Sequence, residues 1–531
     1  MPVVKNEIVR PPLDGGVSKS KIFLTAEETE HPEEVEVEGK IPSYIIGGKY
    51  LRVGPGKFDF RDFTVNHWLD GYALISKFEI HNKTIVFEKK YAQTDAYKKA
   101  MALQKPAISE FGTRAQADAK KGFLSRVIST LLPEFTDNAY STLFQMGPDL
   151  FATCDTQYFT KINPSSLDSE CKCDSQKAFS LNGQCAHPLT DSKGNIFNLG
   201  FSIGATGVKY QVLKIPFGKT SEEMMKNAKI IATISPRWTG QFSTMHSFGM
   251  SENYIIFIEQ PHIVSVKRIA ASVVKGDTLK DWLEWRPEEK NKFYIIDKTT
   301  GKVLKTDYFS NAFYFMHFVN CYEESNQVIC DIISYDSPMV LDSMTLTNLR
   351  GDQSAPADLP YIQRFVIPLI PDLKVSNIRE NLNLVTKSET QCTAVRTGNK
   401  IIITGESITD LGMDLPTLNK KSFGKKVRYC YASGTIHQSS YKHCVCKVDL
   451  ETREVTKWKM NEYTFPGEPY FVPDPKGSRE DDGVLIVGVT DMRQGQKDYL
   501  MILDATDLTE IGRATFKNHV PTALHGIFLP N

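Results

Sequence analysis

The sequence predicts an all-β protein, because short strand-like segments recur from about residue 45 to the C-terminus while long helical periodicity is scarce. The segments are rich in β-branched and aromatic residues and are separated by Gly, Asn, Asp or Pro, as strands and their turns usually are. Five segments show the pattern clearly: Lys83–Lys89, Tyr254–Glu259, Val328–Ser334, Lys400–Thr404 and Val484–Val489.

A loose internal repeat favours a β-propeller among the all-β architectures. Each copy is an apolar strand, an Asp or Asn, a polar turn and a second short strand, and the copies begin at Phe159, Phe293, Cys446 and Leu500. Propeller blades bury their faces against their neighbours, and a chain of this length would hold about six to eight of them. Large closed β structures often form one domain, so we expect residues 1–531 to form one. The irregular spacing leaves a pair of β-sandwiches open.

Charge and hydropathy exclude several classes of function. Lysine plus arginine and aspartate plus glutamate both number 63, and a neutral chain without a long basic run argues against nucleic acid as a partner. Neither a signal peptide nor a membrane-spanning run is visible, so we expect a cytoplasmic, peripherally membrane-associated protein with ten reduced cysteines. Cys171/Cys173 and Cys444/Cys446 are spaced too closely for a structural zinc site, which favours ordinary thiols.

Two segments depart from the strand pattern. Lys120–Glu134 carries apolar residues at helical spacing with basic residues beside them, and His262–Lys275 mixes apolar and basic residues in a similar way. Each is either an amphipathic helix packed on the core or a helix lying in a membrane surface. On the second interpretation, Phe123–Leu132 and Ile263–Val274 would mediate reversible membrane binding.

Four of the eleven histidines lie in contexts suited to inner strands: His187, His246, His317 and His525. No helical HExxH pair is present, and a single histidine is more often structural than a ligand. The blades of a propeller converge on an axis, however, so histidines distant in sequence can meet there. A buried imidazole among apolar residues also needs a partner. The spacing of the four histidines by itself does not exclude that they occur in such contexts by chance.

Motifs across the chain resemble the carotenoid cleavage oxygenases, specifically their animal branch of carotene oxygenases, insect isomerooxygenase and retinoid isomerase. The matching segments are LRVGPGKFDF from Leu51, HWLDGYALISKF from His67, TDNA from Thr136, TKINP from Thr160, AHP from Ala186, HSFGMSENYIIF from His246, EDDGVLIVGV from Glu480 and HGIF from His525. The resemblance runs from about Ile41 to Phe528. It implies a seven-bladed β-propeller with a helical and loop cap over the active-site face, and membrane-facing cap segments around residues 105–135 and 261–285.

The resemblance also implies an iron centre. Fe²⁺ would be held by the four histidines named above, and neutral imidazoles suit that ion. Carboxylates at Asp155, Asp414 and Glu468 would orient three of the ligands. The family usually has glutamate at all three positions, so the two shorter aspartates would need a closer backbone or a bridging water, or would lose the contact. Positions matching the substrate tunnel are Phe111, Cys154, Thr244, Tyr335, Leu415 and Leu524.

The function implied by the resemblance is the cleavage of one double bond of a carotenoid by O2, with the central 15,15′ bond giving retinal as the first expectation. Coupled trans-to-cis isomerisation, eccentric cleavage, hydrolysis and isomerisation of a retinyl ester, and carotenoid binding without catalysis stay open. The retinoid isomerase carries a Pro-Asp-Pro-Cys-Lys segment, whereas RAQADAKKGF follows Glu110–Thr113 here and offers no cysteine for acylation, which disfavours the isomerase. We expect a monomer or weak dimer that takes its substrate from a membrane surface.

Overall fold

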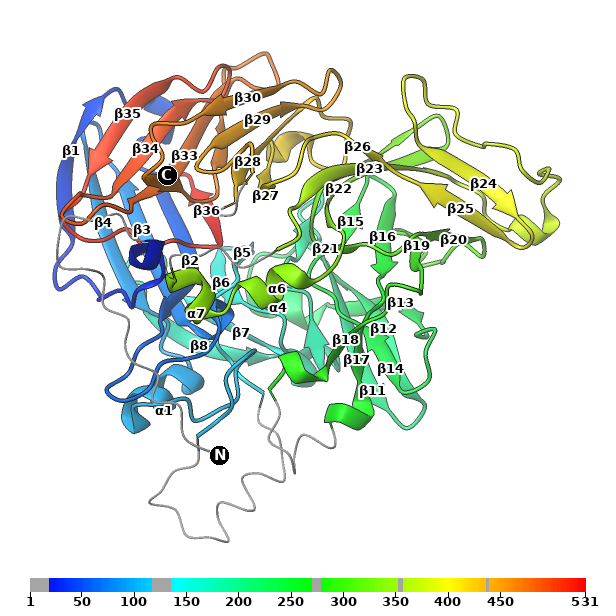
Figure 1. Cartoon of the computed structure of the whole chain (residues 1–531), viewed down its shortest axis with the longest axis horizontal. Helices are drawn as coiled ribbons and strands as arrows, with labels where there is room; N and C mark the ends of the chain where they lie inside the picture. Colours follow the sequence, from blue (N-terminus) through cyan, green and yellow to red (C-terminus); the bar gives the residue numbers. More distant parts are fainter. Residues whose placement is uncertain (1–18, 117–134, 270–277, 352–356, 436–438) are drawn as a thin grey trace, which may run out of the picture.

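The computed structural model describes residues 19–116, 135–269, 278–351, 357–435 and 439–531. The described chain is predominantly β, which confirms the all-β prediction, and its sheets follow one another in chain order around the middle of the molecule (Figure 1). All five segments predicted as strands are strands, two of them with the predicted bounds.

The first and last parts of the chain share one ten-stranded sheet. Its strands are β1 (Glu33–Gly39), β2 (Lys49–Lys57), β3 (Tyr72–Ile80), β4 (Thr84–Tyr91), β31 (Thr464–Pro466), β32 (Tyr470–Pro473), β33 (Gly483–Asp491), β34 (Tyr499–Asp504), β35 (Glu510–Thr515) and β36 (His525–Leu529). β1 pairs with both β4 and β35, and β36 pairs antiparallel with β2. The C-terminal strand is therefore fixed beside an N-terminal one, which places its first residue, His525, opposite Val53.

The next three sheets continue along the chain. One consists of β5 (Thr142–Met146), β6 (Asp149–Thr153), β7 (Tyr158–Ile162) and β8 (Ser169–Asp174). Another consists of β9 (Gly183–Gln184), β10 (Leu189–Thr190), β11 (Ile196–Gly204), β12 (Gly207–Ile215) and β13 (Lys229–Ile234). The third is small and consists of β14 (Gln241–Ser243), β17 (His262–Ser265) and β18 (Leu283–Trp285).

Three further sheets fill the second half. One consists of β15 (Gly249–Met250), β16 (Tyr254–Glu259), β19 (Asn291–Asp297), β20 (Asp307–Ser310), β24 (Thr393–Thr397) and β25 (Lys400–Thr404), with β20 and β25 parallel. The next consists of β21 (Tyr314–Glu324), β22 (Gln327–Tyr335), β23 (Tyr361–Pro368) and β26 (Glu406–Ser407). The last consists of β27 (Met413–Thr417), β28 (Tyr429–Gly434), β29 (Val445–Asp449) and β30 (Val455–Trp458).

Helices are short in the described part of the chain. The α-helices with both ends described are α1 (Asp95–Leu103), α3 (Ser175–Phe179), α4 (Ser221–Lys226), α6 (Met339–Ser343) and α7 (Leu346–Arg350), and residues 266–269 are also helical. The 3₁₀ turns are η1 (Lys19–Phe23), η2 (Ser43–Ile45), η3 (Trp68–Asp70), η4 (Lys280–Trp282), η5 (Leu373–Val375) and η6 (Lys420–Ser422). Within this part, no helix is long and apolar enough to cross a membrane.

Burial along the strands explains why the pattern could be read from the sequence. In β4, buried residues alternate strictly with partly exposed ones, as expected for a strand with one face on the core. In β22 every residue is buried, because it lies between β21 and β23 and its sheet is covered on both faces. Its apolar run, interrupted only at the centre by Asp331, which pairs with Arg364 of β23, therefore still indicates a strand.

The structure corrects part of the proposed amphipathic surface. His262–Ser265 is strand β17 rather than the start of a helix, and Ile263 is completely buried in the core. Backbone pairing of β17 with β14 and β18 prevails over the local helical pattern and turns Ile263 inward. Residues 266–269 of the same segment are helical, as predicted, whereas Lys120–Glu134 and residues 270–275 lie outside the described residues.

Candidate metal centre

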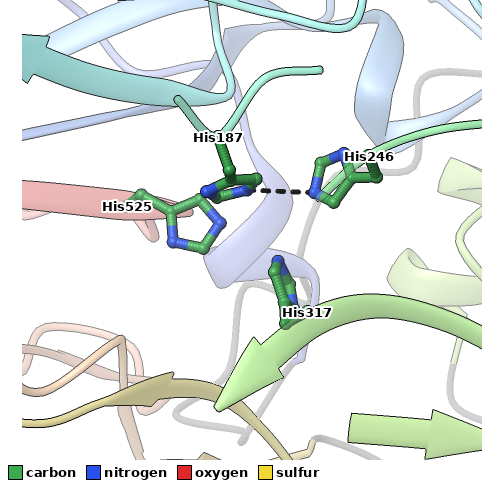
Figure 2. A group of neighbouring side chains, drawn as sticks. All are labelled: His187, His246, His317 and His525. Atoms are coloured by element: carbon green, nitrogen blue, oxygen red, sulfur yellow. Dashed lines mark hydrogen bonds between the residues drawn. The ribbon is translucent and has the colours of Figure 1, made fainter. Parts of the chain in front are cut away.

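Four histidines from distant parts of the chain meet at one point, as Figure 2 shows. His317 lies within β21 and His525 begins β36, whereas His187 and His246 lie in the loops that follow β9 and β14. Ring centroids of His187 lie 4.7, 5.3 and 4.5 Å from those of His246, His317 and His525. Each imidazole offers one nitrogen as a potential metal ligand, and these four nitrogens all lie within 4.8 Å of one another.

Three of these imidazoles are held by a carboxylate on the nitrogen that faces away from the centre. Nδ1 of His246 lies 2.6 Å from Asp155 Oδ2, and Nδ1 of His317 lies 2.7 Å from Asp414 Oδ1. Nδ1 of His525 lies 2.8 Å from Glu468 Oε1. A carboxylate accepts the Nδ1 proton, so each ring keeps its lone pair on Nε2. The two aspartates therefore reach their histidines directly, without a bridging water.

The second oxygen of each carboxylate also has a donor, which fixes the carboxylate in turn. Asp155 Oδ1 accepts the backbone N–H of Ala186 at 2.8 Å, next to His187 in the chain. Glu468 Oε2 accepts the backbone N–H of Gly526, next to His525, at 2.8 Å. Asp414 Oδ2 instead accepts the hydroxyl of Tyr335. The donor from Tyr335 was not expected from the sequence, where this tyrosine is only a tunnel position.

Protonation of the histidines follows their surroundings. Burial, and then the neighbouring imidazoles, lower the pKa of His187 well below its usual value. Burial also lowers the pKa of His317, with Asp414 opposing the shift. At His246 burial again favours the neutral ring, but the Asp155 carboxylate outweighs it and the pKa is raised. Neutral His187 and His317 are in the form that binds a metal.

The donor set fits a metal ion. Nε2 of His317 is buried and has no hydrogen-bond partner among the residues that the structure describes, although an unpaired buried polar atom is costly. Nε2 of His187 and Nε2 of His246 face each other at 3.1 Å, the dashed line in Figure 2. With Nδ1 of His246 donating to Asp155, its Nε2 is a lone pair that points at the same centre. A cation there would satisfy these nitrogens together, and the cluster could hold a metal through four imidazoles.

The centre opens into a large apolar cavity of about 500 Å³. All six predicted tunnel residues line it: Phe111, Cys154, Thr244, Tyr335, Leu415 and Leu524. Three of the four histidines, His246, His317 and His525, also line it.

Sequence reasoning missed a wall of this cavity that short helices provide. Val340 and Leu341 of α6 and Leu349 of α7 contribute side chains, whereas Trp282 of η4, which also lines the cavity, lies within the predicted segment 261–285. These segments have no distinctive motif, and only their helical turns bring their apolar side chains to the cavity. The wall of the cavity therefore includes residues of α6 and α7, which lie outside the two segments that the sequence indicated.

Comparison with known proteins agrees with this architecture. The family model described as retinal pigment epithelial membrane protein matches residues 23–530. The chain is 34% identical to chicken (Gallus gallus) β,β-carotene 15,15′-dioxygenase, over 94% of this chain and 96% of that protein. It is also 34% identical to the mitochondrial carotenoid-cleaving dioxygenase of Macaca fascicularis, over 96% of this chain and 94% of that protein.

Solved structures show the same fold at lower identity. A mutant of the apocarotenoid oxygenase of Synechocystis superposes with a TM-score of 0.75 at 20% identity, covering 96% of this chain and 98% of that one. The cobalt-substituted form of that oxygenase gives a TM-score of 0.74 at 20% identity, covering 97% and 99%. The family model and the relatives at 34% identity, together with the all-β fold and the histidine cluster, define a protein of the carotenoid oxygenase class. The chain belongs to the carotenoid cleavage oxygenase family, in the group whose model carries the retinal pigment epithelial protein's name.

Proposed function

We propose that this protein is an iron(II)-dependent dioxygenase that splits one double bond of a carotenoid. O2 supplies both oxygen atoms, the carbon–carbon double bond breaks, and each half leaves as a carbonyl compound. The observation that carries the proposal is the convergence of four imidazole nitrogens at the wall of a large apolar cavity. Ferrous iron, when bound by these nitrogens, supplies the redox chemistry by which O2 reacts with a polyene.

The chain's own residues supply position and surroundings. Asp155, Asp414 and Glu468 hold three imidazoles in one tautomer and one orientation, which pre-organises the centre before a metal binds. The apolar walls exclude water and match a hydrocarbon substrate, whose transfer from water is favoured by its hydrophobicity. The six tunnel residues would contact the polyene beside the histidines.

We propose the central 15,15′ bond as the site of cleavage, which would give retinal. The relative from chicken is named for that bond, but an equally similar relative is named only as a carotenoid-cleaving dioxygenase. Eccentric cleavage is therefore the second candidate, since identity does not separate the two. Coupled isomerisation is an additional outcome that the products of either reaction would reveal.

Product analysis tests these alternatives. The iron-loaded protein is incubated with a panel of carotenoids under air and under nitrogen, and the products are separated and identified. Central cleavage gives retinal under air and nothing under nitrogen, and ¹⁸O2 labels both new carbonyl groups. Longer and shorter apocarotenoid products would favour eccentric cleavage. Conversion of a retinyl ester under nitrogen would overturn the oxygenase proposal in favour of an isomerohydrolase.

The finer architecture is part of the proposal. We propose seven blades, supported by seven groups of antiparallel strands: β2–β4, β5–β8, β11–β13, β16 with β19, β21–β23, β27–β30 and β33–β35. The first and last of these groups are joined in the ten-stranded sheet. We further propose that residues 1–531 form one domain with a cap that includes segments around 105–135 and 261–285. The protein would bind a membrane surface peripherally, as a monomer or weak dimer, because a carotenoid reaches an apolar cavity more readily from lipid than from water.

A further inference from the structure

His262 is a buried polar side chain in the wall of the apolar cavity. It begins β17, where it pairs with Trp285 of β18, and only 4% of its surface is exposed. It lies outside the histidine cluster and plays no part in the metal centre described above. Its backbone carbonyl accepts the N–H of Thr244 at 2.9 Å, and Thr244 is two residues before His246. His262 therefore lies in the part of the cavity wall that leads to the cluster.

A chain of hydrogen bonds fixes which nitrogen of His262 carries the proton. Gln260 Oε1 accepts the backbone N–H of Phe315 at 3.1 Å, so the amide nitrogen of Gln260 faces Thr244 Oγ1, 3.4 Å away. An amide nitrogen can only donate, so Thr244 Oγ1 accepts this bond. Among the described residues His262 Nδ1 is the only acceptor within reach of the Thr244 hydroxyl, so the hydroxyl proton is donated to Nδ1, at 3.1 Å.

The resulting tautomer has its proton on Nε2. Burial lowers the pKa of His262 to about 4, so the ring is neutral near neutral pH and carries one N–H. Because Nδ1 is the acceptor, that N–H is at Nε2. Nε2 has no hydrogen-bond partner among the described residues, whereas the ring packs edge-to-face with Tyr314 at 5.2 Å between centroids. Contact of an N–H with an aromatic ring is weak compensation for a lost hydrogen bond.

We propose that Nε2–H of His262 donates a hydrogen bond to an oxygen atom of the substrate, which makes an oxygenated carotenoid the preferred substrate class. This rests on the proposed function of the cavity as a carotenoid site. A pure hydrocarbon leaves the donor buried and unpaired, whereas a hydroxyl or carbonyl oxygen pairs with it. Because His262 is joined to Thr244, the bound oxygen also sets how far the polyene advances towards the four histidines. His262 is thus a specificity-determining residue.

The test compares zeaxanthin, which carries a hydroxyl on each ring, with β-carotene, its hydrocarbon parent. His262→Phe keeps an aromatic ring against Tyr314 and removes the donor. In the parent protein we expect kcat/KM and affinity to favour zeaxanthin. In the variant we expect the ratio of zeaxanthin to β-carotene in both quantities to fall about 10-fold, because one unpaired buried donor costs about that much. Affinity is read independently from quenching of tryptophan fluorescence, because Trp68 and Trp282 line the cavity.

Tyr314→Phe is the matched control, because it removes a hydroxyl from the ring that packs on His262 and leaves the Nε2 donor in place. It should retain the preference for zeaxanthin. A preference lost in Tyr314→Phe but kept in His262→Phe would overturn the assignment, as would a parent protein that favours β-carotene or neither carotenoid. If neither carotenoid is cleaved but the affinity ratio still depends on His262, the proposed dioxygenase function fails while the binding role of His262 stands.

Discussion

Asp155 offers the sharpest test of the metal centre, because it holds two neighbouring ligand segments at once. Its Oδ2 accepts from Nδ1 of His246 at 2.6 Å and its Oδ1 accepts the backbone N–H of Ala186 at 2.8 Å. Both partners are donors. In Asp155→Asn the amide has one oxygen and one NH2 group. The oxygen can accept one of these two hydrogen bonds, but the NH2 group would then face the other N–H donor, so that hydrogen bond is lost.

The structure sets the size of the effect. Losing the partner of a ligand histidine typically lowers metal affinity about 10- to 100-fold, which corresponds to about 1.4–2.8 kcal/mol. The side chain of Asp155 is 39% exposed, so water can replace part of the lost bond and the lower end applies. We therefore expect metal affinity to fall about 10-fold in Asp155→Asn, with turnover falling by a similar factor at limiting iron.

Asp155→Glu keeps the negative charge of the side chain and changes only its length. A glutamate at this position would be too long by one methylene, because both oxygens of Asp155 already lie at hydrogen-bond distance from their donors. Overpacking of a closed core costs about 1–3 kcal/mol, but this site opens to the cavity, so the loss should be smaller than that of the asparagine variant. The glutamate variant should be less active than the parent, even though glutamate is the usual residue of the family.

Competition with a chelator measures the metal affinity of both variants, and turnover is measured at limiting iron. Asp62→Asn, whose side chain is 91% exposed, removes the same charge away from the centre and serves as the control. Metal affinity and turnover near parental values in Asp155→Asn would refute the reasoning, and Asp155 would then be a spectator of His246.

Three other predictions follow from the same structure. His317→Ala should reduce bound iron to a small fraction of one equivalent per chain, since it removes one of four donors; full iron by metal analysis would exclude His317 as a ligand. Asp59→Asn should destabilise the fold by about 3 kcal/mol, because Arg350, 2.8–2.9 Å from both Asp59 oxygens and 5% exposed, would lose its counter-charge. Burial raises the pKa of Asp59, but Arg350 outweighs burial and the pKa is lowered. The stabilisation by the Asp59–Arg350 pair is therefore present above about pH 4 and disappears as the pH falls through the lowered pKa. The thermal unfolding temperatures of the variant and the parent, measured against pH, should converge in acid. Changing Phe123, Leu124 and Ile128 together to serine should release the protein from lipid vesicles, and unchanged sedimentation with vesicles would count against that surface.

Local pattern was sufficient for the strands but not for every segment that mixes apolar and basic residues. Tyr254–Glu259 was identified correctly because a β-branched apolar run between turn residues suits a buried strand whatever its partners are. The segment from His262 was identified only in part: residues 266–269 are helical, but His262–Ser265 is a strand, because its apolar residues fit a helix equally well and the decision came from pairing with β14 and β18. Periodicity describes one segment at a time, whereas strand pairing depends on two.

The sequence by itself predicted the β class from local patterns, and its resemblance to the carotenoid cleavage oxygenases implied the four histidines that meet and the carboxylates beside them. Only the tertiary structure decided how those residues are joined: that Asp155 and Asp414 reach their histidines directly, that Tyr335 donates to Asp414, and that His262 turns into the cavity. The physical reason is that a hydrogen bond depends on distance and direction within a fraction of an ångström. Residues up to hundreds of positions apart acquire such geometry only when the sheets have packed around a common centre.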